Sequence, residues 1–166
     1  KEGTVYVSNV KPGISTTDQR EEGFKAAMTN YPNITALETQ FNDDDANKAS
    51  AQVNAVVARA PDLAGIFGAN LFSAIGSADG VKAMGKTGEI KVVAFDAPTR
   101  IVDDLKSGLV DLAIAQHPAE IGYMGVMVAF GHVTGNPVPV SVGTGFTVMT
   151  ADNIDDPNIS KYVYSD

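Results

Sequence analysis

The sequence predicts an α/β domain built on a doubly wound parallel sheet, and two observations support this fold class. Short apolar segments typical of strands alternate five times with amphipathic segments typical of helices, and the loops between them are short. The fourth strand segment, 92–95, is almost continuously apolar, as expected for a strand covered on both faces. Because two parallel strands need a crossover between them, this alternation favours a parallel sheet.

The first two strands are each followed by a helix. We expect these strands at 4–10 and 34–41, where polar turn residues end each apolar segment. The stretch 15–18 offers an N-cap to the first helix, and Gln19 stands three residues after Thr16, as in a capping box. The expected buried face of this helix consists of Phe24, Ala27 and Met28. The expected buried stripe of the second helix consists of Ala46, Ala49, Val53, Val56 and Val57.

Three further strands are expected at 63–69, 91–95 and 109–115. A third helix at 71–84 and a short helix after residue 98 lie between them. The third helix is expected to bury Leu71, Ala74, Ile75, Ala78 and Val81, and the short one Ile101, Val102 and Leu105.

The strand at 92–95 ends at a carboxylate, Asp96. Pro98 then prevents the strand from continuing, so a tight loop follows. In open α/β sheets, ligand-binding groups follow the carboxyl ends of the strands, which suggests a binding role for Asp96. The alternative is that Asp96 only caps the helix that begins near Thr99.

Composition and charge restrict the possible functions. The 166 residues suffice for one domain with a sizeable core, and 44% are apolar and 19% charged, as in globular proteins. The net charge is −8 and no cluster of Lys and Arg occurs, which argues against binding to nucleic acid or anionic membranes. The chain has no cysteine, and its two histidines, His117 and His132, are too far apart for a metal-site motif, so we expect neither metal nor cofactor. No apolar run approaches the length of a membrane span, and no signal peptide is visible, so we expect a mature protein or a fragment.

Polar side chains follow every predicted strand, and in a parallel sheet these positions share one edge. They are 9–11, 42–45, Asn70, Asp96 and Gln116, with 15–19 beside the first. The sequence has no Gly-x-Ser-x-Gly elbow, no Walker lysine and no Gly-x-Gly-x-x-Gly after a strand, so we expect no enzyme. Carboxylates and amides without a nucleophile suit neutral, hydroxyl-rich ligands. Alternatively, these loops only cap helices, which we expect to hold mostly for 43–45, whereas Gln116 has no obvious capping role.

Three motifs resemble the ribose-type periplasmic sugar-binding proteins. They are Gly-Ile-Phe-Gly-Ala-Asn at 65–70, Val-Ala-Phe-Asp at 93–96 and Leu-Ala-Ile-Ala-Gln-His-Pro at 112–118. Proteins of this family are type I solute receptors of ABC importers and are related to the effector domain of lactose-repressor-like regulators. The resemblance implies a flavodoxin-like lobe in which Asn70, Asp96 and Gln116 bind the ligand, with Gln116 at a hinge crossover between two lobes.

Two departures from the ribose receptors concern the ligand. Asp18 stands where those receptors carry an Arg against the sugar, and Asp44 stands where they carry an aromatic residue that stacks on it. The sequence Thr-Asp-Gln at 17–19 instead resembles the autoinducer-receptor branch, in which the Asp and the Gln contact a small hydroxylated furanoid. The resemblance therefore implies a ligand set of Asp18, Gln19, Asp44, Asn70, Asp96 and Gln116.

The resemblance also implies that most of an N-terminal lobe is missing, because family members are about twice as long and have two lobes. Residues 1–115 would form the C-terminal lobe, 116–148 the hinge crossover and the segment that returns to the missing lobe, and 149–166 a tail that rejoins the lobe. The implied function is that of the substrate-binding component of an ABC-type sugar importer, periplasmic, with a small sugar-like solute and the transporter permease as partners. In this chain alone, we expect the apolar segment 118–134 to self-associate or to fold back onto a free face.

Two other functions remain to be weighed. The effector core of a lactose-repressor-like regulator shares the fold, but those regulators usually lack the ending seen here at 153–162, and no pair of DNA-binding helices is present. A small flavodoxin-like enzyme or a response regulator is the third class. A receiver domain would need an acidic pair after its first strand and a Lys after its last, where this chain has Asn9 and Gln116.

Overall fold

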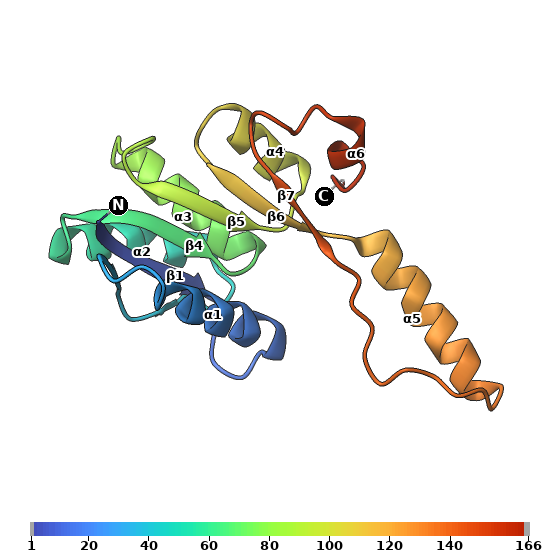
Figure 1. Cartoon of the computed structure of the whole chain (residues 1–166). Coiled ribbons are helices and arrows are strands. Elements are labelled where there is room, and N and C mark those ends of the chain that lie inside the picture. The colour runs from blue at the N-terminus through green and yellow to red at the C-terminus, as the bar shows by residue number, and fades with distance from the viewer. Residues whose placement is uncertain (1, 165–166) are drawn as a thin grey trace.

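A computed structural model describes residues 2–164, in which seven strands form one sheet (Figure 1). The strand order is β2-β1-β4-β5-β6-β7, and β3 also pairs with β1. The strands are β1 (Gly3–Asn9), β2 (Ile34–Ala36), β3 (Gln40–Phe41), β4 (Leu63–Gly68), β5 (Lys91–Phe95), β6 (Leu112–Gln116) and β7 (Phe146–Met149). All pairs are parallel except β6 and β7. The predicted parallel α/β fold is therefore confirmed, and the antiparallel strand β7 is an addition that the sequence did not predict.

Helices lie on both faces of this sheet. They are α1 (Ser15–Met28), α2 (Ala46–Arg59), α3 (Leu71–Ala83), α4 (Thr99–Lys106), α5 (Pro118–Val133) and α6 (Pro157–Ser160). One hydrophobic cluster joins α2, α3 and α4 to one face of the sheet. A smaller cluster contains strand residues that point to the opposite face, together with Phe24 of α1. This division is the doubly wound arrangement that follows from right-handed crossovers.

The main core lies between the sheet and the helices α2, α3 and α4. It includes Tyr6, Ile66, Val92, Ala94, Ala113, Val53, Val56, Ala74, Ala78, Val81, Ile101 and Leu105. The helices α2 and α3 touch closely, since a Cβ on Gly76 would lie 2.2 Å from the carbonyl oxygen of Ala46. The predicted stripes of these helices agree with this core, except that Ala46, Leu71, Ile75 and Val102 are only partly buried.

The opposite face of the sheet is covered only in part by the described residues. Phe24 of α1 stacks on Phe67 of β4, with the ring centroids 5.8 Å apart. Farther along the sheet, Val93, Phe95 and Ile114 are only half-buried and line a groove of about 460 Å³. The expectation that 92–95 is covered on both faces is therefore wrong for this face, because α1 packs mainly against β1 and β2, and although its Arg20 reaches Phe95, the side chains of Val93, Phe95 and Ile114 stay half-buried.

Some predicted boundaries differ from those of the structure. The segment 34–41 forms two short strands, β2 and β3, which pair with different parts of β1. The last parallel strand begins only at Leu112, because the N–H groups of Leu109 and Val110 both donate to the carbonyl of Asp104 in the turn after α4. Within α1, Phe24 and Met28 are half-buried as expected, but Ala27 is exposed.

The predicted capping box of α1 is wrong. The helix begins at Ser15 with Ile14 as its N-cap residue, and no side chain bonds to the end of the helix. Thr17 instead donates back to the carbonyl of Ile14, at 3.3 Å, and Asp18 accepts a bond from the N–H of Gly13 in the preceding loop. The side chains of the first turn therefore stabilise the loop before the helix and not the helix end itself.

Helix α5 leaves the sheet after β6 and projects away from the other elements (Figure 1). None of its residues is buried against the described part of the chain. Its large exposed side chains are Ile121, Tyr123, Val126, Met127, Phe130 and Val133. The returning segment contacts one side of this helix, since a Cβ on Gly131 would lie 2.9 Å from Val138, but these six large side chains stay exposed within residues 2–164. Isolated helices of this length gain little stability from propensity alone, so the exposed apolar surface indicates a missing packing partner.

The segment after β7 returns to the main core. Met149, the last residue of β7, and Ile154, which follows it, are almost fully buried there, and Tyr164 pairs with Pro98 in an isolated bridge. Among residues 2–164, no helix has the length and apolar character needed to cross a membrane.

Candidate functional site

The parallel strands bring most of the predicted ligand residues to one edge of the sheet. Strands β4, β5 and β6 are adjacent and parallel. Asn70 is the second residue after β4, Asp96 directly follows β5, and Gln116 ends β6. Asp44 reaches the same edge because it is bonded to Asn70. This edge is the candidate binding site.

Asp96 and Gln116 form a pair at the ends of β5 and β6. The amide Nε2 of Gln116 donates to Oδ1 of Asp96 over 2.7 Å. Asp96 has a φ of +77°, a left-handed conformation that is rare outside glycine, and its N–H donates to the carbonyl of Ile114. The N-cap residue of α4 is Pro98, and no side-chain bond caps this helix. The alternative that Asp96 serves as the cap of α4 is therefore wrong.

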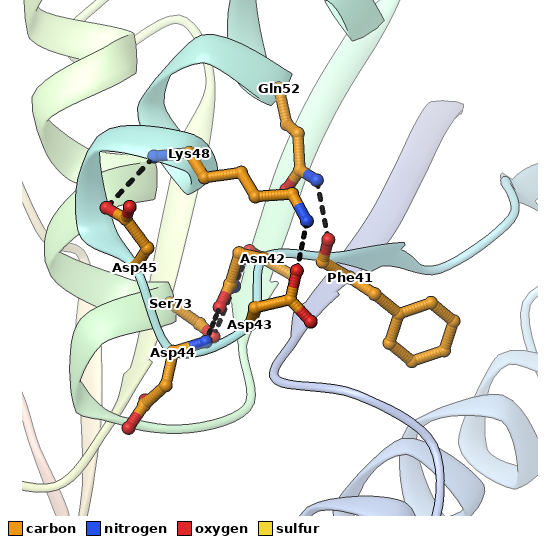
Figure 2. Close-up of polar contacts among 9 residues, drawn as sticks. Phe41, Asn42, Asp43, Asp44, Asp45, Lys48, Gln52 and Ser73 are labelled. Atoms are coloured by element: carbon orange, nitrogen blue, oxygen red, sulfur yellow. Dashed lines mark hydrogen bonds and ion pairs between the residues drawn. The ribbon is translucent and has the colours of Figure 1, made fainter.

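A buried side-chain amide, that of Asn42, holds the loop before α2 in place (Figure 2). Asn42 is completely buried, and its Nδ2 donates to Ser73 of α3 over 2.7 Å and to Ser8 of β1 over 3.1 Å. Its Oδ1 accepts the N–H of Asp44 over 2.9 Å. A buried amide with partners on three elements holds the loop in one conformation, because breaking any of these bonds would leave a buried polar group unpaired.

The carboxylates of this loop divide between capping and the edge. Asp45 caps α2 by accepting bonds from the N–H groups of Asn47 and Lys48, and Asp43 forms an ion pair with the Lys48 side chain (Figure 2). Asp44, which has a φ of +65°, instead accepts a bond from Nδ2 of Asn70 over 2.6 Å. The expectation that 43–45 mostly cap the helix thus describes Asp45 but not Asp44.

Asn70 has two functions in this arrangement. Its Oδ1 accepts the N–H of Ser73 and so caps α3, while its Nδ2 is bonded to Asp44. The side chain is therefore fixed from both ends, with Asp44 beside it at the open edge.

The structure does not join the two remaining predicted residues to these pairs. Asp18 lies in the first turn of α1, half-buried, with Oδ2 bonded to the N–H of Gly13 over 2.9 Å. Gln19 is exposed on the same turn, and within residues 2–164 no side-chain hydrogen bond connects it to the other predicted ligand residues. Both side chains belong to the helix that follows β1, the strand next to β4.

The sequence prediction did not include Arg20, which lies beside this edge. Its guanidinium carbon lies 3.5 Å from the centroid of the Phe95 ring, and Nη1 donates to the carbonyl of Ala69 over 2.8 Å. Burial lowers the pKa of Arg20 from its usual value, and the negative charge of Asp96 opposes this shift. A signal was available in the sequence, because Arg20 precedes Phe24 by four residues and therefore shares its helix face.

The segment that leads from β6 to α5 and the segment that leads from α5 back to β7 contact each other beside the sheet. His117, directly after β6, forms a hydrogen bond of 2.8 Å between Nε2 and Oγ1 of Thr147 in β7. The His117 ring also stacks on Tyr162, with centroids 3.8 Å apart. Gly145, which has a φ of +76°, lies against the same ring, and a Cβ there would approach it to 3.3 Å. The departing and returning segments therefore form one joint beside Gln116.

The polar edge fits the predicted chemistry better than the groove on the open face does. The groove adjoins the edge at Gln116 and Arg20, but it is lined mainly by apolar side chains, which cannot hydrogen-bond hydroxyl groups. The edge presents two carboxylates and two amides, which accept and donate such bonds.

Comparisons with known proteins agree with this geometry. The chain matches the family described as the periplasmic binding protein domain over residues 1–137. It is 28% identical to the D-allose-binding periplasmic protein of Escherichia coli over 89% of this chain and 48% of that protein. It is 31% identical to a D-ribose/D-allose-binding protein of Pseudomonas aeruginosa over 74% of this chain and 39% of that protein. The chain thus spans about half the length of these relatives or less.

A solved structure is more similar still. It is that of an ABC transporter solute-binding protein from Agrobacterium vitis bound with α-D-tagatopyranose, with 64% identity and a TM-score of 0.97. The alignment covers 99% of this chain and 55% of that protein. The family predicted from the three sequence motifs is therefore confirmed, and the chain belongs to the periplasmic binding protein domain family.

Proposed function

We propose that this chain forms one half of a sugar-binding receptor of an ABC importer. The observation that carries this proposal is the 64% identity, over 99% of the chain, to a solute-binding protein bound with a ketohexose. The polar edge supports it, because Asp44, Asn70, Asp96 and Gln116 are held by fixed loops at the ends of neighbouring strands.

Hydroxyl groups of a small sugar would take the place of the bonds that these residues make with one another. In the structure, Gln116 donates to Asp96 and Asn70 donates to Asp44. A sugar hydroxyl can donate to a carboxylate and accept from an amide, so it can enter either pair without leaving a polar group unpaired. The carboxylates accept the stronger bonds because they are charged.

The ligand would be a neutral monosaccharide or a sugar-like furanoid. Asp18 and Asp44 add negative charge to this edge, and Asp44 stands where ribose receptors carry an aromatic residue that stacks on the sugar. A sugar held here would thus be recognised mainly through hydroxyl donors, with Asp18 and Gln19 reaching it from α1.

The remaining half of the receptor would cover the exposed helix α5. In this proposal, residues 1–115 form the C-terminal lobe, 116–148 contain the hinge and the segment that packs on a second lobe, and 149–166 rejoin the first lobe. The uncovered apolar side chains of α5 support this division, as does the joint formed by His117 and Thr147. Closing of two lobes over the solute would bury the polar edge.

We further infer that the receptor acts in the periplasm, delivers its solute to a membrane permease and catalyses no reaction. The names of the relatives describe periplasmic binding and import, which supports this assignment. The proposal needs neither a cofactor nor a nucleic acid.

Calorimetric titration of the two-lobed receptor that contains this chain tests the proposal. The ligand panel would hold D-tagatose, D-allose, D-ribose, D-fucose and D-arabinose, with L-leucine as a non-carbohydrate control. We expect at least one sugar to bind with a Kd of about 10 μM or lower, equivalent to roughly −7 kcal/mol, and L-leucine not to bind. Absence of binding across the sugars of this panel and other monosaccharides would refute the proposal.

A further inference from the structure

We infer that Arg20 is a positioning residue for the sugar site, because its guanidinium holds the ends of the two strands that carry Asn70 and Asp96. This inference rests on the proposed function. It concerns a residue that lies beside the polar edge but is not one of the predicted ligand residues.

The guanidinium connects three elements at one point. It extends from α1, donates to the carbonyl of Ala69 over 2.8 Å, and lies over the Phe95 ring at 3.5 Å. Ala69 directly precedes Asn70, and Phe95 directly precedes Asp96. A planar cation can form a hydrogen bond in its plane and stack with its face at the same time, which an ammonium group cannot do. Arg20 therefore fixes the distance between the two strand ends from which the ligand residues extend.

Asp96 requires such support. Its backbone has a φ of +77°, and a residue other than glycine keeps this conformation only where its surroundings determine it. One support is the bond from its N–H to the carbonyl of Ile114 in β6. The other is the preceding residue, Phe95, whose ring is held under the guanidinium of Arg20. Loss of the guanidinium would leave Phe95 beside an open groove, free to change its rotamer and with it the direction of Asp96.

The electrostatics of the site agree with this geometry. Arg20 is half-buried beside apolar side chains, and burial lowers its pKa, while the charge of Asp96 acts to keep it protonated. The attraction acts equally on both partners, so Arg20 also favours orientations of Asp96 that keep its carboxylate near the edge. No direct bond joins the two side chains in the described residues, which leaves the carboxylate oxygens available for Gln116 and for a ligand.

The competing explanation is that Arg20 only covers apolar surface with its long stem, as arginines often do. Arg20→Met distinguishes the two explanations, because methionine keeps an apolar stem of similar length but loses the bond to Ala69 and the charge. Arg20→Lys keeps the charge but loses the planar group. Lys25→Met is the matched control on α1, since Lys25 lies more than one turn farther along and pairs with Glu21.

The experiment is a double-mutant cycle in the two-lobed receptor, with sugar affinity measured by calorimetry and stability measured by thermal melting. We expect Arg20→Met to weaken binding about tenfold, Arg20→Lys to weaken it about threefold to tenfold, and Lys25→Met to change it by less than about twofold. In the background of Asp96→Asn, Arg20→Met should weaken sugar affinity by about twofold or less. The reason is that Arg20 acts by positioning the Asp96 carboxylate, which this background no longer contains.

Three results would overturn the inference. In the first, Arg20→Met binds the sugar within about twofold of the parent affinity, while Asp96→Asn binds it at least about tenfold more weakly. This result would leave the proposed function intact. The second is full additivity of Arg20→Met and Asp96→Asn. If Arg20→Met does not fold, the third result is that Arg20→Lys binds the sugar with the affinity of the parent. A parent receptor that binds no sugar would instead refute the proposed function, and the inference with it.

Discussion

Among the residues of this chain, we expect Asp96 to contribute most to sugar affinity through its negative charge. The loss of affinity in Asp96→Asn measures this contribution. Asparagine has nearly the same shape and tolerates the left-handed backbone at φ +77°, so the substitution removes charge with little change of structure. Its Oδ1 can still accept the bond from Gln116, which is 2.7 Å long in the parent. The unliganded protein should therefore lose little stability.

The magnitude follows from the bonds that the carboxylate would make. A hydrogen bond to a charged group contributes roughly 1.5–3 kcal/mol, against about 0.5–1.5 kcal/mol for a neutral pair. Because each Asp oxygen can accept a hydroxyl group, two bonds would each weaken by about 1–1.5 kcal/mol. The total of about 2–3 kcal/mol corresponds to a loss of affinity of roughly 30-fold to 150-fold. Asp96→Ala, which also leaves Gln116 unpaired, should weaken binding by about a hundredfold or more.

Calorimetry with the sugar that binds most tightly is the assay, and Asp62→Asn is the matched control. Asp62 lies directly before β4, at the opposite edge of the sheet from Asn70, and should leave affinity unchanged. A change of less than about fivefold for Asp96→Asn would contradict the assignment of Asp96 as a charged acceptor of sugar hydroxyls.

Three further predictions concern stability and association. Asp45→Ala should destabilise the fold by about 1 kcal/mol in urea unfolding through loss of the α2 cap, without a change of sugar affinity. Burial acts to raise the pKa of Glu21, but hydrogen bonds, chiefly from Lys25, lower it overall. The ionised Glu21 therefore stabilises the fold above a pH of about 4.3, and this stabilisation is lost as the pH falls through the lowered pKa. Glu21→Gln should reduce the loss of stability at acid pH. The 166-residue chain alone should self-associate through α5 and bind sugar about a thousandfold more weakly than the two-lobed receptor, and Phe130→Asp should reduce the association in sedimentation.

The sequence was sufficient to predict the alternation of strands and helices along the chain, and with it a parallel sheet, because hydrophobic periodicity reports burial directly. The apolar residues of α2 recur on one face, as a packed helix requires, and Val53 and Val56 are completely buried. The strand boundaries near 109–111 were not predictable in this way. Leu109 and Val110 are buried and apolar, but their N–H groups bond to a helix carbonyl and not to a neighbouring strand.

The site could be predicted in part for a similar reason. Asn70, Asp96 and Gln116 follow strands, and the geometry of a parallel sheet places such residues at one edge without further information. The pairing of Asp44 with Asn70 depends on the left-handed loop conformation at Asp44, which a sequence of three consecutive aspartates does not specify. Arg20 was missed because its role arises only when α1 is docked against β4 and β5.

The antiparallel strand β7 has a consequence for the order of folding. Strand β7 pairs with β6 only after the chain has passed through α5 and returned (Figure 1), so the His117–Thr147 contact joins residues that are thirty positions apart. Strand β7 also lies at the edge of the sheet, and its Phe146 and Val148 side chains are exposed, so few buried contacts hold it in place. We therefore expect β7 and the segment after it to form last and to open first, so that amide protons of 146–149 exchange with solvent before those of β4 and β5.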